Sequence, residues 1–139
     1  MYRQAVHVPV EIEFSFRASA LISTMIIFNL ALAHQLLAAT HEKKEQLLSK
    51  AAKLYEYGFN LQRAEAFGSN ILFTLATVNN LGLIHQQLNA SVQAKNCFEH
   101  LLSSMMYLID CGEGHGYEFD GFLRNVSAMI SQPSSAAAA

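Results

Sequence analysis

Histidine and cysteine are the side chains of this chain that could ligate a metal ion or act as nucleophiles. The sequence contains six histidines and two cysteines, but no His-x-x-x-His or Cys-x-x-Cys spacing of the kind that zinc sites use. Glu113, His115, Glu118 and Asp120 gather in a glycine-rich stretch that could bind an ion. A solvated hinge explains this stretch better, so we expect no metal site.

Other signatures of catalysis or nucleic-acid binding are missing from the sequence. There is no phosphate-binding glycine loop, no nucleophile elbow and no helix with paired carboxylates. The formal net charge is -2, and no cluster of Lys and Arg indicates a nucleic-acid face. We therefore expect a protein that is not an enzyme, has no cofactor and binds no nucleic acid.

The composition indicates one domain with an unusually apolar surface. The 139 residues are 52% apolar and 14% charged, whereas about 25% charged residues is usual for globular domains. Either a partner covers much of the surface, or the chain is a piece of a longer helical array. Cys97 and Cys111 are 14 residues apart on or just after one expected helix, about 21 Å along its axis. A disulfide between them is therefore not expected, and reduced thiols favour an intracellular, reducing compartment, either the cytoplasm or an organelle interior.

Residues 1–17 are expected to form an extended N-terminal arm. From Val6 to Phe16, apolar residues alternate strictly with other residues, which is typical of an extended segment with one apolar face. Pro9 disfavours a central strand position because it cannot donate a ladder hydrogen bond. Two interpretations are open: the arm lies along the helices of its own chain, or it docks on another subunit.

The segment 18–39 contains no Asp, Glu, Lys or Arg and is long enough to span a bilayer. Its polar interruptions, which include Asn29, His34 and Gln35, fit a buried core helix better. The residues before it include Glu11 and Glu13, so a secretory signal peptide is not expected. Membrane contact stays an alternative that we do not predict.

The remaining pattern predicts an all-α domain over residues 18–131, followed by a disordered tail at 132–139. Apolar residues recur at helical spacing, and glycine-rich or polar breaks separate the segments. Asn89 to Ser91 is expected to be a tight turn. The five expected helices cover residues 18–39, 43–66, 71–88, 92–109 and 117–130.

The two helices on either side of this turn carry a repeat-like pattern. Leu81-Gly82 is followed by His85, by Ala94 twelve residues after Gly82, and by Phe98 four residues after Ala94. This pattern resembles the tetratricopeptide repeat, in which small residues let two antiparallel helices approach and rings fill the space beside them. The resemblance implies a right-handed stack of antiparallel helical hairpins, with about five helices in this chain.

An imperfect copy of the pattern lies upstream. Asn29 to His34 parallels Asn80 to His85, and Ala51 then takes the place of Ala94. His34 and His85 stand where the family has an aromatic ring, so we expect both to pack rather than to bind metal. The copies lie 51 residues apart, whereas the family repeats about every 34 residues. The resemblance covers about residues 18–109.

The resemblance also implies a binding site, since the first helix of each hairpin lines a concave groove in this family. Asn29 and Asn80 occupy matching positions, and a carboxamide carries the donor and the acceptor that a peptide backbone needs. The alternative is that each Asn bonds a neighbouring helix. The other residues that would line the groove are Met25, Phe28, Leu32, Gln35, Leu36, Ala76, Asn79, Leu83, Gln86 and Gln87.

Three functions are open to a chain with these features. The first is a non-enzymatic scaffold or adaptor that binds a peptide or a partner helix through the groove. The second is a structural subunit of a larger assembly, which could be membrane-associated or a homo-oligomer. The third is an enzyme on a helical bundle, which would need a cluster of titratable residues in a pocket, and the sequence indicates no such cluster.

Overall fold

The computed structural model describes residues 3–6, 16–64, 71–112 and 119–130 of the chain. They form helices and no strands, so the predicted all-α class is confirmed for this part of the chain. The predicted arm starts with the non-helical residues 3–6, but Phe16 and Arg17 already belong to the first helix. The helices are α1 (Phe16–Leu37), α2 (Lys44–Ala64), α3 (Ile71–Gln87), α4 (Ser91–Asp110) and α5 (Asp120–Ile130).

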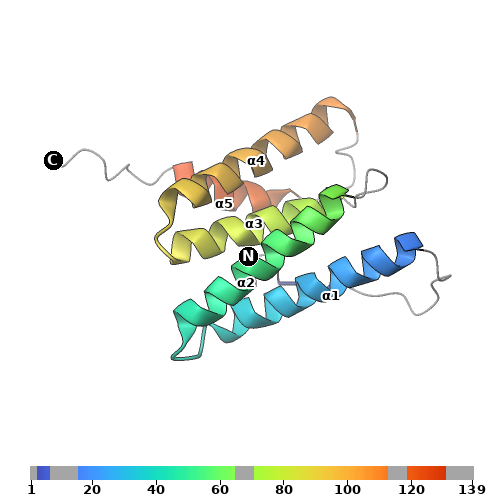
Figure 1. Cartoon of the computed structure of the whole chain (residues 1–139). Helices are drawn as coiled ribbons and strands as arrows, with labels where there is room; N and C mark the ends of the chain where they lie inside the picture. The colour runs from blue at the N-terminus through green and yellow to red at the C-terminus, as the bar shows by residue number, and fades with distance from the viewer. Residues whose placement is uncertain (1–2, 7–15, 65–70, 113–118, 131–139) are drawn as a thin grey trace.

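The helices pack in the order of the chain (Figure 1). α1 packs along α2, α3 packs along α4, and α2 joins these pairs by packing against α3. α5 contacts both α4 and α3. As a result α3 has helices on both sides, while α1 lies at the edge of the assembly.

The sequence of α3 suits this central position. Nine of its 17 residues are buried, and they point in every direction around the helix axis. A helix that is apolar on all sides must be enclosed, whereas α2 and α4 carry charged outer faces. The enclosure buries the side chains of Thr77, Asn79 and Asn80 together with the apolar ones.

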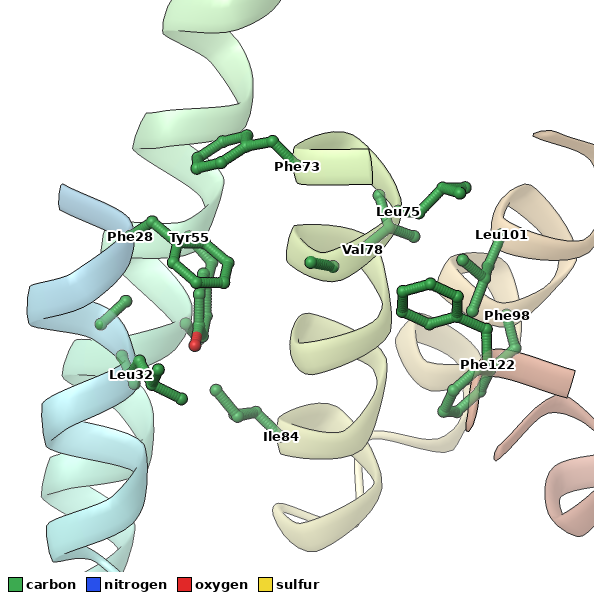
Figure 2. Packing of buried hydrophobic residues seen from close by; sticks show 14 of the residues in the cluster. Phe28, Leu32, Tyr55, Phe73, Leu75, Val78, Ile84, Phe98, Leu101 and Phe122 are labelled. Atoms are coloured by element: carbon green, nitrogen blue, oxygen red, sulfur yellow. The ribbon is translucent and has the colours of Figure 1, made fainter. Parts of the chain in front are cut away.

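Buried apolar side chains fill both sides of α3 (Figure 2). On one side, the Phe28 ring of α1 lies 5.4 Å from that of Tyr55 on α2 and 5.0 Å from that of Phe73 on α3. On the other side, α3 faces Phe98 and Leu101 of α4 and Phe122 of α5. Rings from three helices thus fix how α1, α2 and α3 meet.

Small residues lie where the helices approach one another. Ala31, Ala51, Gly82 and Ala94 are all buried, as their place in the repeat pattern predicts. A Cβ atom on Gly82 would lie 3.1 Å from Cζ of Phe98 and 3.2 Å from Cβ of Cys97. A side chain at position 82 would therefore require Phe98 or Cys97 to move by a few tenths of an ångström.

The turn between α3 and α4 is tight, as expected from Asn89 to Ser91. Asn89 has φ 58°, a left-handed conformation that Asn tolerates better than most residues. The N–H of Ala90 then donates to the carbonyl of His85 at 2.8 Å, and Ser91 already starts α4. This local geometry turns the chain so that α4 returns along α3.

Several expectations lie outside the described residues. They concern the docking of arm residues 7–15, the end of the second expected helix within 65–70, the glycine-rich stretch at 113–118 and the tail from 131 onward. Among the described helices, none combines the length and hydropathy that crossing a bilayer requires.

The close approach of α3 and α4 yields a first prediction. Replacing Gly82 with Ala should destabilise the protein by about 1–2 kcal/mol, because overpacking against the fully buried Phe98 outweighs the better helix propensity of Ala. Urea denaturation followed by circular dichroism measures this change.

Gly121 provides the matched control. It is also helical, but a Cβ atom there would meet nothing within 4 Å. Gly121→Ala should therefore leave the free energy of unfolding unchanged or raise it by up to about 1 kcal/mol. Equal effects of the two substitutions would contradict the proposed close packing at Gly82.

Candidate functional site

Asn29 binds the backbone of the non-helical residues 3–6 at the surface of α1. Its Oδ1 accepts a hydrogen bond from the N–H of Val6 at 2.7 Å, and its Nδ2 donates to the carbonyl of the same residue at 2.8 Å. Donor and acceptor of one carboxamide thus satisfy both polar backbone groups of one residue. The Val6 side chain is half-buried and packs against the hydrophobic core.

The position of Asn29 on α1 explains why its side chain reaches an arm rather than α2. Ile27 faces α2, since its Cγ2 lies 3.4 Å from where a Cβ of Gly58 would be. Each residue advances about 100° around a helix, so Asn29 lies about 200° from Ile27. Its carboxamide therefore lies on the flank of α1 that α2 leaves open.

Asn80, the matching residue of α3, is fully enclosed. Its Nδ2 donates to the Tyr55 hydroxyl at 3.0 Å, and its Oδ1 accepts from Nδ2 of Asn79 at 3.2 Å. The Tyr55 hydroxyl in turn donates to Oε1 of Gln35 at 3.1 Å. With Asn79 and Asn80 each 0% exposed, neither can touch a partner in this arrangement. The sequence leaves two roles open for Asn29 and Asn80, which are binding a peptide backbone and bonding to a neighbouring helix. Asn80 has the second role, because it bonds to Tyr55 of α2.

The same network reaches α5. Nδ2 of Asn125 donates to Oδ1 of Asn79 at 2.7 Å. Side-chain hydrogen bonds therefore run from α1 through α2 and α3 to α5, with members Gln35, Tyr55, Asn80, Asn79 and Asn125. Two buried side-chain atoms have no hydrogen-bond partner in the described structure. They are Nε2 of Gln35, whose Oε1 belongs to the network, and Oγ1 of Thr77 on α3.

The other residues expected in the groove divide by burial. Phe28, Leu32 and Gln35 are core residues, so they are not available to a partner in this arrangement. Met25 and Ala76 are also buried, whereas a residue that lines a groove should be accessible to a partner. Leu83 and Gln86 are half-buried, and Leu36 and Gln87 are exposed. Asn29 is thus an expected groove residue that hydrogen-bonds the backbone of a non-helical segment, at Val6.

Burial is the main cause of the pKa shifts of three groups near the core. It raises the pKa of the Tyr55 hydroxyl above its usual range, against a smaller lowering by the hydrogen bond from Asn80. It also raises the pKa of the Cys97 thiol to about 11, with a further contribution from the charge of Glu56. The pKa of His85 is lowered by burial, which Glu56 partly opposes. All three groups are thus held neutral at pH 7, which suits packing.

The histidines and cysteines of the described residues form no metal-binding cluster. These residues contain no group of three His, Cys, Asp or Glu side chains that could hold a metal ion. The His100 ring packs edge-on against Phe59 at 6.1 Å, and Nδ1 of His41 accepts from the N–H of Lys43. Cys97 and Cys111 are both free thiols. Glu113, His115 and Glu118 lie outside the described residues.

Three partners in these contacts were not expected from the sequence. The sequence pattern identifies Val6 only as one apolar position of the arm, and it predicts no polar contact for Tyr55 or Asn125. A signal for Asn125 does exist, because it is an amide at helical spacing from the apolar residues Phe122 and Met129, which pack with the hydrophobic core. A buried amide needs a partner, and Asn79 supplies one.

Comparison of the chain with protein-family models, curated proteins and solved structures gives no match. The resemblance to tetratricopeptide repeats therefore stays a prediction from the sequence.

The enclosed network yields a second prediction. Tyr55→Phe should destabilise the protein by about 1–3 kcal/mol, because it leaves Oε1 of Gln35 and Nδ2 of Asn80 buried without this partner. The free energy of unfolding is measured with urea at pH 7. In a double-mutant cycle, the loss for Tyr55→Phe with Gln35→Leu should be smaller than the sum of the single losses. Additive losses would mean that the two side chains do not interact.

Proposed function

We propose that this protein is a non-enzymatic scaffold that binds an extended segment of a protein partner along the open flank of α1. The observation that carries the proposal is the pair of hydrogen bonds between Asn29 and the backbone of Val6. A site that satisfies both polar groups of one residue accepts any extended backbone, provided that this residue is not proline. Specificity then comes from the apolar side chain, which is valine here.

The proposal includes the tetratricopeptide-like arrangement. The order of packing, in which α2 joins the α1–α2 pair to the α3–α4 pair, supports a stack of antiparallel hairpins. In this interpretation α5 covers the end of the stack by packing on α3 and α4. A reducing intracellular compartment belongs to the same proposal, and two free thiols are consistent with it.

A third prediction tests the peptide site. On an array of extended 12-residue peptides, the native chain should bind a subset that shares a small apolar residue without proline. Asn29→Ala should weaken this binding at least about tenfold, since it removes two hydrogen bonds worth about 1 kcal/mol each.

Asn60→Ala is the matched control. Asn60 is an exposed Asn on α2, so its removal should leave the peptide profile unchanged. An Asn29→Ala profile identical to that of the native chain would overturn the proposed site, wherever else peptides bind.

A structural subunit of a larger assembly is the alternative, and the outer face of α1 favours it. Ile26, Leu30 and Leu37 are 55%, 48% and 48% exposed. Together with the exposed Ala33, they follow the spacing i, i+4, i+7 and i+11, which places them within about 60° of one another. A continuous apolar stripe of this kind is a feature of covered surfaces.

A fourth prediction separates the two functions. If the protein is an adaptor, light scattering after size chromatography should show a monomer. Leu30→Lys should then leave the protein monomeric. Tyr57→Lys, at a 58% exposed residue of α2, is the matched control. An oligomer that Leu30→Lys dissociates and Tyr57→Lys does not would favour the structural subunit.

A further inference from the structure

The occupant of the Asn29 site is a segment of the same chain. Of residues 3–6, Arg3, Gln4 and Ala5 are exposed, while Val6 is half-buried and is the residue that Asn29 binds. The contact joins residues 23 positions apart in the sequence. Residues 3–6 therefore fill the site through one residue, by its N–H, its carbonyl and its apolar side chain.

We propose that the N-terminal segment is a built-in competitor for the peptide site, so that a partner's extended segment binds at Asn29 only after Val6 has left. This inference rests on the proposed function, because it assigns the regulation of the same site. The partner segment must offer what Val6 offers: a free N–H, a free carbonyl and a small, β-branched apolar side chain. A segment with proline at this position lacks the N–H and is excluded.

The small number of hydrogen bonds at residues 3–6 allows this part of the arm to be exchanged. Residues 3–6 bond to the described helices through the two hydrogen bonds at Asn29, and the three residues before Val6 are exposed. Covalent linkage gives such a segment a high effective concentration at the site. A free peptide therefore has to bind the fraction of molecules in which the site is open, and its apparent affinity falls in proportion to that fraction.

The test compares full-length chains that differ in the arm. The probe is a fluorescently labelled peptide with the sequence of residues 1–10, and binding is measured by fluorescence anisotropy. In Val6→Pro, the arm can no longer donate to Oδ1 of Asn29, so the site is released. We expect this variant to bind the peptide at least tenfold more tightly than the native chain does.

Gln4→Pro is the matched control, because it places proline at an exposed residue of the same arm and leaves the N–H of Val6 intact. Its affinity for the peptide should equal that of the native chain. Adding Asn29→Ala to Val6→Pro should reduce the affinity at least tenfold. If Val6→Pro alters the helical circular dichroism, Val6→Asp replaces it, since a charge at the half-buried position also disfavours docking.

The outcomes separate this inference from the proposed function. Equal affinity of the native chain and Val6→Pro, with loss on adding Asn29→Ala, would overturn the competitor and leave the peptide site in place. Absence of binding to Val6→Pro would overturn both, since the released site should accept the sequence that fills it. A native dimer that Val6→Pro converts to monomers would also overturn competition within one chain, because the arms would then be exchanged between two copies.

Discussion

The packing of the helices depends on the hydrogen bonds of their buried carboxamide side chains. An amide buried without hydrogen bonds costs about 1–3 kcal/mol, so each enclosed Asn or Gln restricts which groups can lie beside it. α3 has helices on both sides, and its two asparagines are satisfied by Tyr55 of α2 and Asn125 of α5. These bonds join helices that apolar packing alone would orient less specifically.

The same chemistry at the edge of the assembly has a different result. Asn29 lies in α1, which has the open flank, and there the nearest available backbone is that of Val6. One amide in an enclosed helix thus bonds within the core, while the corresponding amide in an edge helix bonds the backbone of a non-helical residue, Val6. The proposed function follows from this difference in position rather than from a difference in residue type.

Much of the fold could be predicted from the sequence, because helical periodicity and the turn at Asn89 depend on local chemistry. The expected helix bounds agree with the observed ones to within three residues or fewer, and the small residues Gly82 and Ala94 are buried as expected. The roles of Asn29 and Asn80 could not be separated in this way. Their sequence surroundings match, and only the position of α3 between its neighbours decides that Asn80 is enclosed.

The binding role of Asn29 is tested most directly by hydrogen exchange of the Val6 amide, measured by NMR on the full chain. Because this N–H donates to Oδ1 of Asn29, it should exchange more slowly than the amides of Gln4 and Ala5, and Asn29→Ala should remove the protection while the amides of α3 stay protected. A Val6 amide that exchanges as fast as its neighbours in the native chain would contradict the account.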